Sequence, residues 1–554
     1  MSLRHGSLVA AVLAVGPELA ASPPVTPPAS ARPTTIPLRV APELIAEAAE
    51  VWPVISGPEN PVWPGWQASG TPLLFYLPGE QDVLVNHPRP PAGFVPYQGP
   101  VRFPGGRILV RDGDTIVATD GQNTSLDVNG TPTLVVADPL SALRQEVRAL
   151  LEDPRPPAEK ARGIGFRDLS PDPYDQLALI VHEAFHVFQN RAAPDKQADE
   201  MLLLHYPVLS VENNAGFAEE GAALAAALRS DPGPALRAAA VRWLAIRKGR
   251  RALLPKEAVA YEDGVEFTEG LAKYTEYRLF EVLEGRTPRP EIWWVRGFRG
   301  YADLSPCRKQ LVTMMERHMR GEVLVNGDPY GTAPLRMRLY YSGMAVGVLL
   351  DRLSGEWKTR ILEPETSLTS LVESAVHPDG RELHDAAEMV RKERAGDPLV
   401  AAKRRLAEEG RARIDAMVST IEHGPGTGIV VDASALADPK VSLAFTPFGI
   451  TVVDEDRTIF AQVPVRARFA DGSEIVQKEA MPLLQDKKRR RISFRLPEVV
   501  SAEALADASR EGRWEGREPH AVRVLLPGVE VIAANAVVER IGKDILVSLR
   551  QRRN

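Results

Sequence analysis

Two histidines four residues apart mark the segment of this chain that is best suited to chemistry. Residues 177–189 read LALIVHEAFHVFQ, which places His182 and His186 on one face of an expected helix, where both rings can bind one metal ion. Glu183 follows the first histidine, and from there its carboxylate can reach a metal-activated water without binding the metal itself. We therefore expect His182 and His186 to be metal ligands and Glu183 to be a general base.

A catalytic zinc site needs a third protein ligand beside its water. The single cysteine, Cys307, excludes a cysteine-based site, and His205 is interpreted as a surface residue or one that contacts a ligand from outside the metal site. Two glutamates remain: Glu220 in FAEEGAA and Glu269 in FTEGLAKYTEY, 34 and 83 residues after His186. Each precedes a glycine and small residues, which would let its helix approach the metal helix closely. The aromatic and threonine flanks favour Glu269.

The segment FTEGLAKYTEY resembles the glutamate-ligand helix of the gluzincin zinc peptidases, especially the aminopeptidase N-like group. That helix typically reads Asn-Glu-Gly-Phe-Ala, with a tyrosine and a glutamate soon after. The resemblance implies that Glu269 is the third zinc ligand. A second match is LYYSGMA at 339–345, because in that group a tyrosine three residues before a glycine stabilises the tetrahedral oxyanion. Tyr340 occupies that position, and its neighbour Tyr341 could substitute for it.

The resemblance covers residues 170–353 only and has two departures. The interval between His186 and Glu269 is far longer than in most of the group, so extra helices must be inserted there. The Gly-x-Met-Glu-Asn-type strand that recognises a substrate amino terminus is absent from the sequence, so aminopeptidase specificity is not implied.

The hydrophobic pattern predicts a multidomain α+β protein. A mostly helical, zincin-like catalytic domain at 141–424 is expected between a small β-rich N-terminal module at 40–140 and a β-sandwich-like module at 425–554. Strands are expected in the first module at 73–77, 82–86, 107–111, 115–119 and 133–137, and no chemistry is predicted there. Within the helical domain, Arg242, Arg247, Arg250 and Arg251 are interpreted as a solvated helix C-terminus.

The amino-terminal residues and the overall composition limit where and on what the protein acts. Arg4 and His5, a short apolar run and small residues predict a signal peptide at 1–21, followed by a proline-rich linker at 22–39. We therefore expect a secreted or periplasmic protein. Lys and Arg number 67 against 73 Asp and Glu, a net charge of −6 that argues against nucleic-acid binding. The sequence contains no run of 18 or more apolar residues, so no transmembrane helix is predicted.

These features predict a zinc-dependent metallopeptidase that acts on peptide or protein substrates, with Zn²⁺ as its cofactor. An alternative is a catalytically degenerate peptidase scaffold that serves as a secreted or periplasmic binding protein. A third hypothesis keeps the zinc but has the protein hydrolyse a non-peptide amide. Bound metal, together with loss of activity in Glu183→Gln, would separate the first two, and a substrate screen would separate the third.

Overall fold

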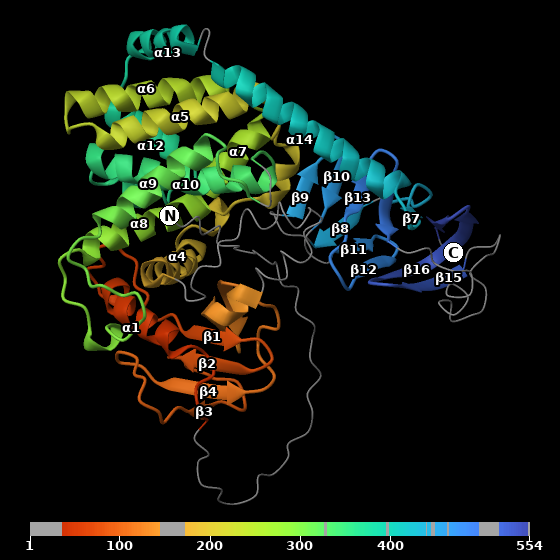
Figure 1. Ribbon diagram of the computed structural model, residues 1–554, viewed down its shortest axis with the longest axis horizontal. Coiled ribbons are helices and arrows are strands. Elements are labelled where there is room, and N and C mark those ends of the chain that lie inside the picture. Colours follow the sequence, from red (N-terminus) through yellow and green to blue (C-terminus); the bar gives the residue numbers. More distant parts are fainter. Residues whose placement is uncertain are drawn as a thin grey trace, which may run out of the picture.

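The structure is a computed structural model that describes residues 36–144, 172–325, 329–394, 398–438, 440–444, 449–461, 465–497 and 520–551. The molecule is mixed α/β, 46% helical and 20% strand, with a β-sheet toward each end of the chain and helices between them (Figure 1). The expected order of a helical middle flanked by β-rich ends is thus confirmed. The predicted signal peptide at 1–21 and most of the proline-rich linker lie outside the described residues.

The N-terminal sheet has six strands in the order β3-β4-β2-β1-β6-β5, and only β1 and β6 pair in parallel. Among the described residues the module also contains one long buried helix, α1, which the alternating pattern did not indicate, and no strand forms at 115–119. Its elements are α1 (Pro42–Ser56), β1 (Leu73–Leu77), β2 (Gln81–Val85), β3 (Val95–Pro96), β4 (Ile108–Asp112), β5 (Thr124–Val128) and β6 (Thr131–Ala137).

The helical part packs around α10, whose residues from Thr332 to Leu350 are all buried. This helix contacts α5, α7, α8, α9 and α12. The elements are α4 (Pro173–Ala192), η1 (Pro194–Lys196), η2 (Glu200–His205), α5 (Val211–Arg229), α6 (Pro234–Arg251), α7 (Lys256–Val265), the π-helical turn η3 (Glu266–Gly270), α8 (Leu271–Leu283), η4 (Pro290–Ile292), α9 (Ser305–Met319), α10 (Thr332–Leu353), α11 (Trp357–Arg360), α12 (Leu368–Val376), α13 (Gly380–Arg394) and α14 (Pro398–His423).

The turn η3 crosses α10 at two glycines that face each other. A methyl group built on Gly270 would lie 2.6 Å from the Cα atom of Gly343, so both positions require the absence of a side chain. The sequence prediction that the glycine after Glu269 would allow a close approach to the metal helix is therefore wrong in its partner. Gly270 brings η3 against α10 instead.

The C-terminal sheet follows the long helix α14, which leads from the helical part to it in Figure 1. Ten strands lie in the order β8-β11-β12-β16-β17-β7-β14-β13-β10-β9, with β15 paired to β16 and only β7 and β17 parallel. The strands are β7 (Thr427–Asp432), β8 (Val441–Ala444), β9 (Ile450–Val452), β10 (Arg457–Phe460), β11 (Arg466–Phe469), β12 (Glu474–Gln477), β13 (Leu483–Asp486), β14 (Arg491–Leu496), β15 (His520–Leu526), β16 (Val529–Ile541) and β17 (Asp544–Leu549).

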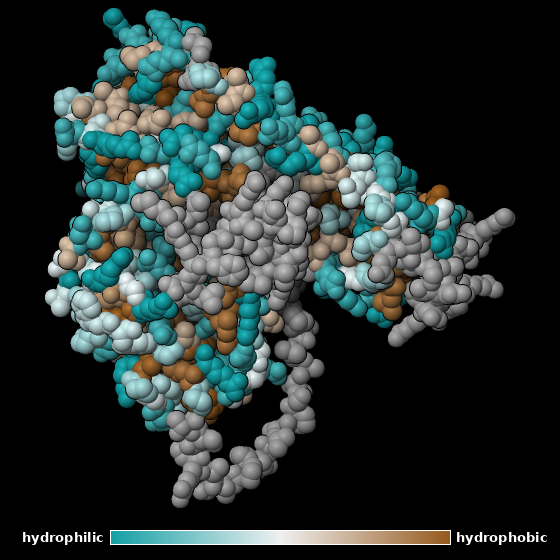
Figure 2. Space-filling view, in the orientation of Figure 1, coloured by the Kyte–Doolittle hydropathy of each residue, from teal (hydrophilic) through white to brown (hydrophobic). Residues whose placement is uncertain are grey.

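The described helices differ from membrane-spanning ones, and the visible surface is mixed in polarity. Within the described part of the chain, no helix combines the length and the apolar character needed to cross a bilayer. The coloured residues in Figure 2 form a mosaic in which hydrophobic groups are interspersed with hydrophilic ones. The long buried helix α10 is consistent with this, because it carries Arg336 and Arg338 among its apolar residues.

Candidate metal centre

The helix α4 presents the two histidines on one face and packs through the other. It starts at an N-cap, Asp172, whose side chain accepts a hydrogen bond of 2.9 Å from the backbone N–H of Tyr174. The rings of His182 and His186 follow with their centroids 4.9 Å apart. Between them, Phe185 packs against two tryptophans of the N-terminal module, Trp63 and Trp66, at 4.8 and 5.1 Å between ring centroids. The N-terminal module therefore supports the histidine helix from behind.

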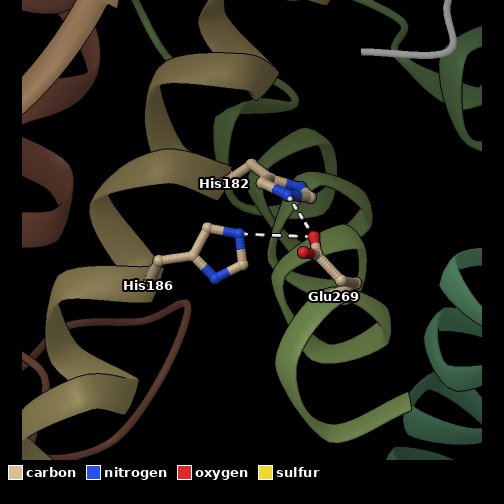
Figure 3. Close-up of side chains that lie close together, drawn as sticks. All are labelled: His182, His186 and Glu269. Atoms are coloured by element: carbon tan, nitrogen blue, oxygen red, sulfur yellow. Dashed lines mark ion pairs between the residues drawn. The ribbon is translucent and has the colours of Figure 1, made fainter. Parts of the chain in front are cut away.

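Glu269 is brought to the histidines from η3. Its Oε2 atom lies 3.5 Å from Nε2 of His182 and 3.4 Å from Nε2 of His186 (Figure 3). One ligand atom from each of the three residues lies within 4.8 Å of the others, so this group could hold a metal ion. Ligand atoms at about 2.0–2.1 Å from one tetrahedral ion are separated by about 3.3 Å, close to the distances seen here.

Five residues of the centre carry buried polar atoms without a hydrogen bond. Among the described residues, no hydrogen bond is made by Nε2 of His182 and His186, Oε2 of Glu269, both carboxylate oxygens of Glu183 or the hydroxyl of Tyr340, and the ligand atoms approach one another only to 3.4–3.5 Å. Leaving a buried polar atom unpaired costs about 1–3 kcal/mol. Such a concentration of cost in one place is expected where a protein binds a polar ligand. The donor set, two imidazoles and a carboxylate, fits a divalent cation.

Each histidine is oriented by a hydrogen bond at its other ring nitrogen. Nδ1 of His182 lies 2.8 Å from Glu276, which also pairs with Lys273 at 2.8 Å. Nδ1 of His186 lies 3.0 Å from Oε1 of Gln189. In a neutral ring, a donor proton on Nδ1 leaves the lone pair on Nε2, the atom that faces Glu269, and such partners typically orient metal-binding histidines.

Glu269 is held by an arginine on its other oxygen. Oε1 accepts a hydrogen bond of 2.9 Å from Nη2 of Arg336, and Nη1 of the same guanidinium pairs with Glu200. Burial favours the neutral acid, but the two histidines and Arg336 hold the pKa of Glu269 well below its usual range. Glu269 is therefore ionised, with one oxygen held by Arg336 and the other directed at the histidines.

Burial shifts the other two polar groups of the centre toward their protonated forms. It raises the pKa of Glu183, against the opposing effect of the two histidines. It also raises the pKa of Tyr340 well above 10, so this hydroxyl keeps its proton at neutral pH. The Tyr340 ring stacks on His182 with 6.3 Å between centroids, and it belongs to α10, as the sequence predicted.

The remaining candidates lie elsewhere. Glu220 is buried in ion pairs with Arg247 and Arg250, so it is not brought to the histidines. Tyr341 stacks on His318, with centroids 4.8 Å apart, and His205 is exposed, as expected. The interpretation of Arg247 and Arg250 as part of a solvated helix end is wrong. Their side chains are buried, because Glu262 and Glu266 of the next helical segment, together with Glu220, pair with them.

Sequence reasoning missed the residues that orient the ligands. Glu276 had a local signal, because it lies seven residues after Glu269 and hence on the same helix face. Gln189 had one too, three residues after His186. Arg336 and Glu200 had none, since each reaches the centre from a separate segment.

Comparison with known proteins adds no relative: no family model, curated protein or solved structure matches this chain. What the chain does must therefore be inferred from the centre itself.

Proposed function

We propose that this protein is a zinc-dependent metallopeptidase, with a zincin-like helical part and peptides or proteins as substrates. The proposal depends on one observation, the convergence of buried polar atoms that make no hydrogen bond, from His182, Glu183, His186, Glu269 and Tyr340. His182 and His186 would each bind zinc through Nε2, and Glu269 would bind it through Oε2. Three protein ligands of these types, with one position left for water, are typical of catalytic rather than structural zinc.

When bound, zinc supplies a Lewis acid that polarises a carbonyl oxygen and lowers the pKa of water. The protein's part begins with Glu183, which takes the proton from water as the oxygen attacks the carbonyl carbon of the substrate. A buried carboxylate of raised pKa is a stronger base for this step than an exposed one. Protonated Glu183 then donates the same proton to the amide nitrogen as the carbon–nitrogen bond breaks.

Tyr340 supplies the second function, stabilisation of the oxyanion. Its hydroxyl is protonated at neutral pH and lies near Arg336 and Glu269 without a hydrogen bond of ordinary geometry among the described residues, so it can donate to an oxygen that gains negative charge. Its position on the buried helix α10, which is fixed against η3 by the crossing of Gly270 and Gly343, keeps the hydroxyl beside the ligands.

Zinc content and hydrolysis, measured on wild type and Glu183→Gln, test the proposal. Both proteins should contain near-stoichiometric zinc by elemental mass spectrometry, because Glu183 is not a ligand. Only wild type should cleave members of a peptide library, with a loss of about 10²–10⁴ in rate for the variant. A wild-type protein that takes up no zinc even after loading would refute the enzyme and leave the binding scaffold. Zinc with hydrolysis of non-peptide amides alone would refute the peptide substrate.

The proposed setting is outside the cytoplasm. It depends on the cationic and apolar pattern of residues 1–21, which lie outside the described residues. Amino-terminal sequencing of the protein recovered from its native host tests this directly. A mature chain that starts near residue 22 is expected, and a chain that retains residues 1–21 would contradict it.

A further inference from the structure

Gln189 links one histidine of the centre to the turn that carries the glutamate. We infer that Gln189 is a positioning residue, and that the π-helical turn η3 exists in part to give it an anchor. The inference rests on the proposed metal centre, since it concerns how that centre is kept in order. It is carried by two hydrogen bonds of the Gln189 amide, to His186 and to the backbone of Phe267.

The anchor is a carbonyl that a regular α-helix would not offer. In an α-helix the Phe267 carbonyl would accept from the backbone N–H of Leu271, four residues later. Here the Leu271 N–H donates to the carbonyl of Glu266, in the i→i+5 pattern of a π-helix. The Phe267 carbonyl accepts instead from Nε2 of Gln189, at 2.6 Å. The π-turn thus makes a backbone acceptor available at the surface of the helix.

This anchor determines which way the Gln189 amide points. A carbonyl can only accept, so the NH₂ group of Gln189 must face Phe267 and its Oε1 must face His186. Oε1 can in turn only accept, so Nδ1 of His186 must carry the proton. The lone pair of His186 is then on Nε2, the atom 3.4 Å from Glu269. One turn of backbone therefore sets the tautomer of a ligand on another helix.

The same turn also sets the rotation of Glu269. One residue more than an α-helical turn changes the direction of the side chains that follow by about 100°. The turn is fixed in this geometry by Glu266, which pairs with Arg247 and accepts a hydrogen bond from Ser342 of α10. Phe267 and Glu269 lie two residues apart in this turn. The orientation of His186, through Gln189, and the position of Glu269 therefore both depend on η3.

Gln189→Leu removes both hydrogen bonds with little change in volume. We expect it to fold, by circular dichroism, and to lose about 10- to 100-fold in zinc affinity, as is typical when an outer partner of a metal ligand is removed. The visible d–d spectrum of the Co²⁺-loaded protein should change as well. Gln189→Glu, which keeps an acceptor for His186 but no donor for Phe267, should bind zinc more tightly than Gln189→Leu and less tightly than wild type.

Gln176→Leu is the matched control. Gln176 is a buried glutamine of the same helix, and Nε2 of its side chain has no partner among the described residues, so its loss should leave zinc affinity and the Co²⁺ spectrum unchanged. A folded Gln189→Leu with wild-type affinity and spectrum would overturn the inference. So would an equal loss in Gln176→Leu.

A readout without metal separates this inference from the proposed function. Nitrogen-15 NMR of histidine-labelled, metal-free protein should show His186 protonated at Nδ1 in wild type and in a mixture of tautomers in Gln189→Leu. If wild type binds neither Zn²⁺ nor Co²⁺, the proposed function fails, and the NMR result alone decides on Gln189. The same tautomer in both proteins would overturn the positioning role.

Discussion

Replacing Glu269 by glutamine should nearly abolish metal binding, whereas the same replacement at Glu220 should lower stability and leave metal binding in place. Both glutamates are buried and both contact arginine, so burial alone does not distinguish them. Their partners do. Glu269 shares one oxygen with Arg336 and directs the other at His182 and His186, while the two oxygens of Glu220 are taken by arginines of α6.

The expected sizes follow from these contacts. In Glu269→Gln the new amide can still accept a hydrogen bond from Arg336, but the anionic ligand is gone and the metal-free protein also loses the charge that pairs with Arg336 and His182. With zinc at 1,000 times the dissociation constant, binding adds about 4 kcal/mol to stability; a 1,000-fold weaker site leaves about 0.4 kcal/mol. Glu220→Gln removes one member of a buried ion-pair network, which costs about 3–5 kcal/mol. We expect the lower end, since Arg247 retains Glu266.

Zinc per chain and urea unfolding, each with and without chelator, provide the assay. Wild type and Glu220→Gln should both gain stability from zinc, from different starting values. Glu269→Gln should start below the stability of chelated wild type, because Arg336 and protonated His182 lose a buried carboxylate, and it should gain almost nothing from zinc. A Glu269→Gln protein that binds zinc as tightly as wild type would show that Glu269 is not a ligand. A Glu220→Gln protein that is stable but no longer binds zinc would show that Glu220 is the third ligand.

Three further outcomes are expected. Tyr340→Phe should lower kcat by about 10²–10³ with little loss of stability, because the hydroxyl makes no hydrogen bond of ordinary geometry among the described residues. Tyr341→Phe should change neither quantity, and equal kcat values for the two variants would contradict the oxyanion role. Gly343→Ala should destabilise the protein by about 1–3 kcal/mol and weaken zinc binding, because the methyl would lie 2.7 Å from the Cα atom of Gly270. Gly249→Ala, at an exposed helical site with open space, should be neutral or stabilising. Burial opposes protonation of His182, but the two carboxylates beside it raise its pKa to about 9, so its protonated form stabilises the metal-free fold fully below about pH 6.5 and this contribution is lost as pH rises through 9. Zinc must displace that proton, so calorimetry at about pH 7 in buffers of different ionisation enthalpy should show proton release and an affinity that rises up to about pH 9; pH-independent binding would count against the assignment.

The local part of the centre could be predicted because it depends on one helix. The spacing of His182 and His186 fixes their common face once the segment is helical, and Asp172 and Pro173 give that helix a clear start. Glu183 directly follows His182 on the same helix, so its place beside the ligands could be predicted from the same segment. None of these positions requires knowledge of the tertiary structure.

Glu269 is different, because 83 residues separate it from His186 and no spacing rule spans such an interval. The residues alone left Glu220 as an alternative, although the flanks of Glu269 were better, and the resemblance to the gluzincin helix favoured Glu269 further. The structure shows why the two look alike in sequence: each precedes a glycine at which two helices cross. Gly221 faces Met319 of α9, and Gly270 faces Gly343 of α10. The glycine signals a close crossing but does not say with which helix.

The buried charges could not be predicted for a general reason. A cluster of arginines at the end of α6 has the pattern of a solvated helix C-terminus, and only the packing of α5 and α7 against it supplies the carboxylates. Buried ion pairs contribute less to stability than apolar residues of the same volume often would. They are directional, however, which apolar packing is not.

That directionality explains why charged residues occupy the interior around this centre. Arg247 on Glu266 and Arg336 on Glu269 fix the rotation of the helix α7–η3–α8 about its own axis from two sides. An apolar interface would tolerate a rotation that moves a side-chain oxygen by an ångström or more, and three ligand atoms that must meet at one ion would not. The cost of burying these arginines is therefore best understood as the cost of holding Glu269 in register with a helix 83 residues away.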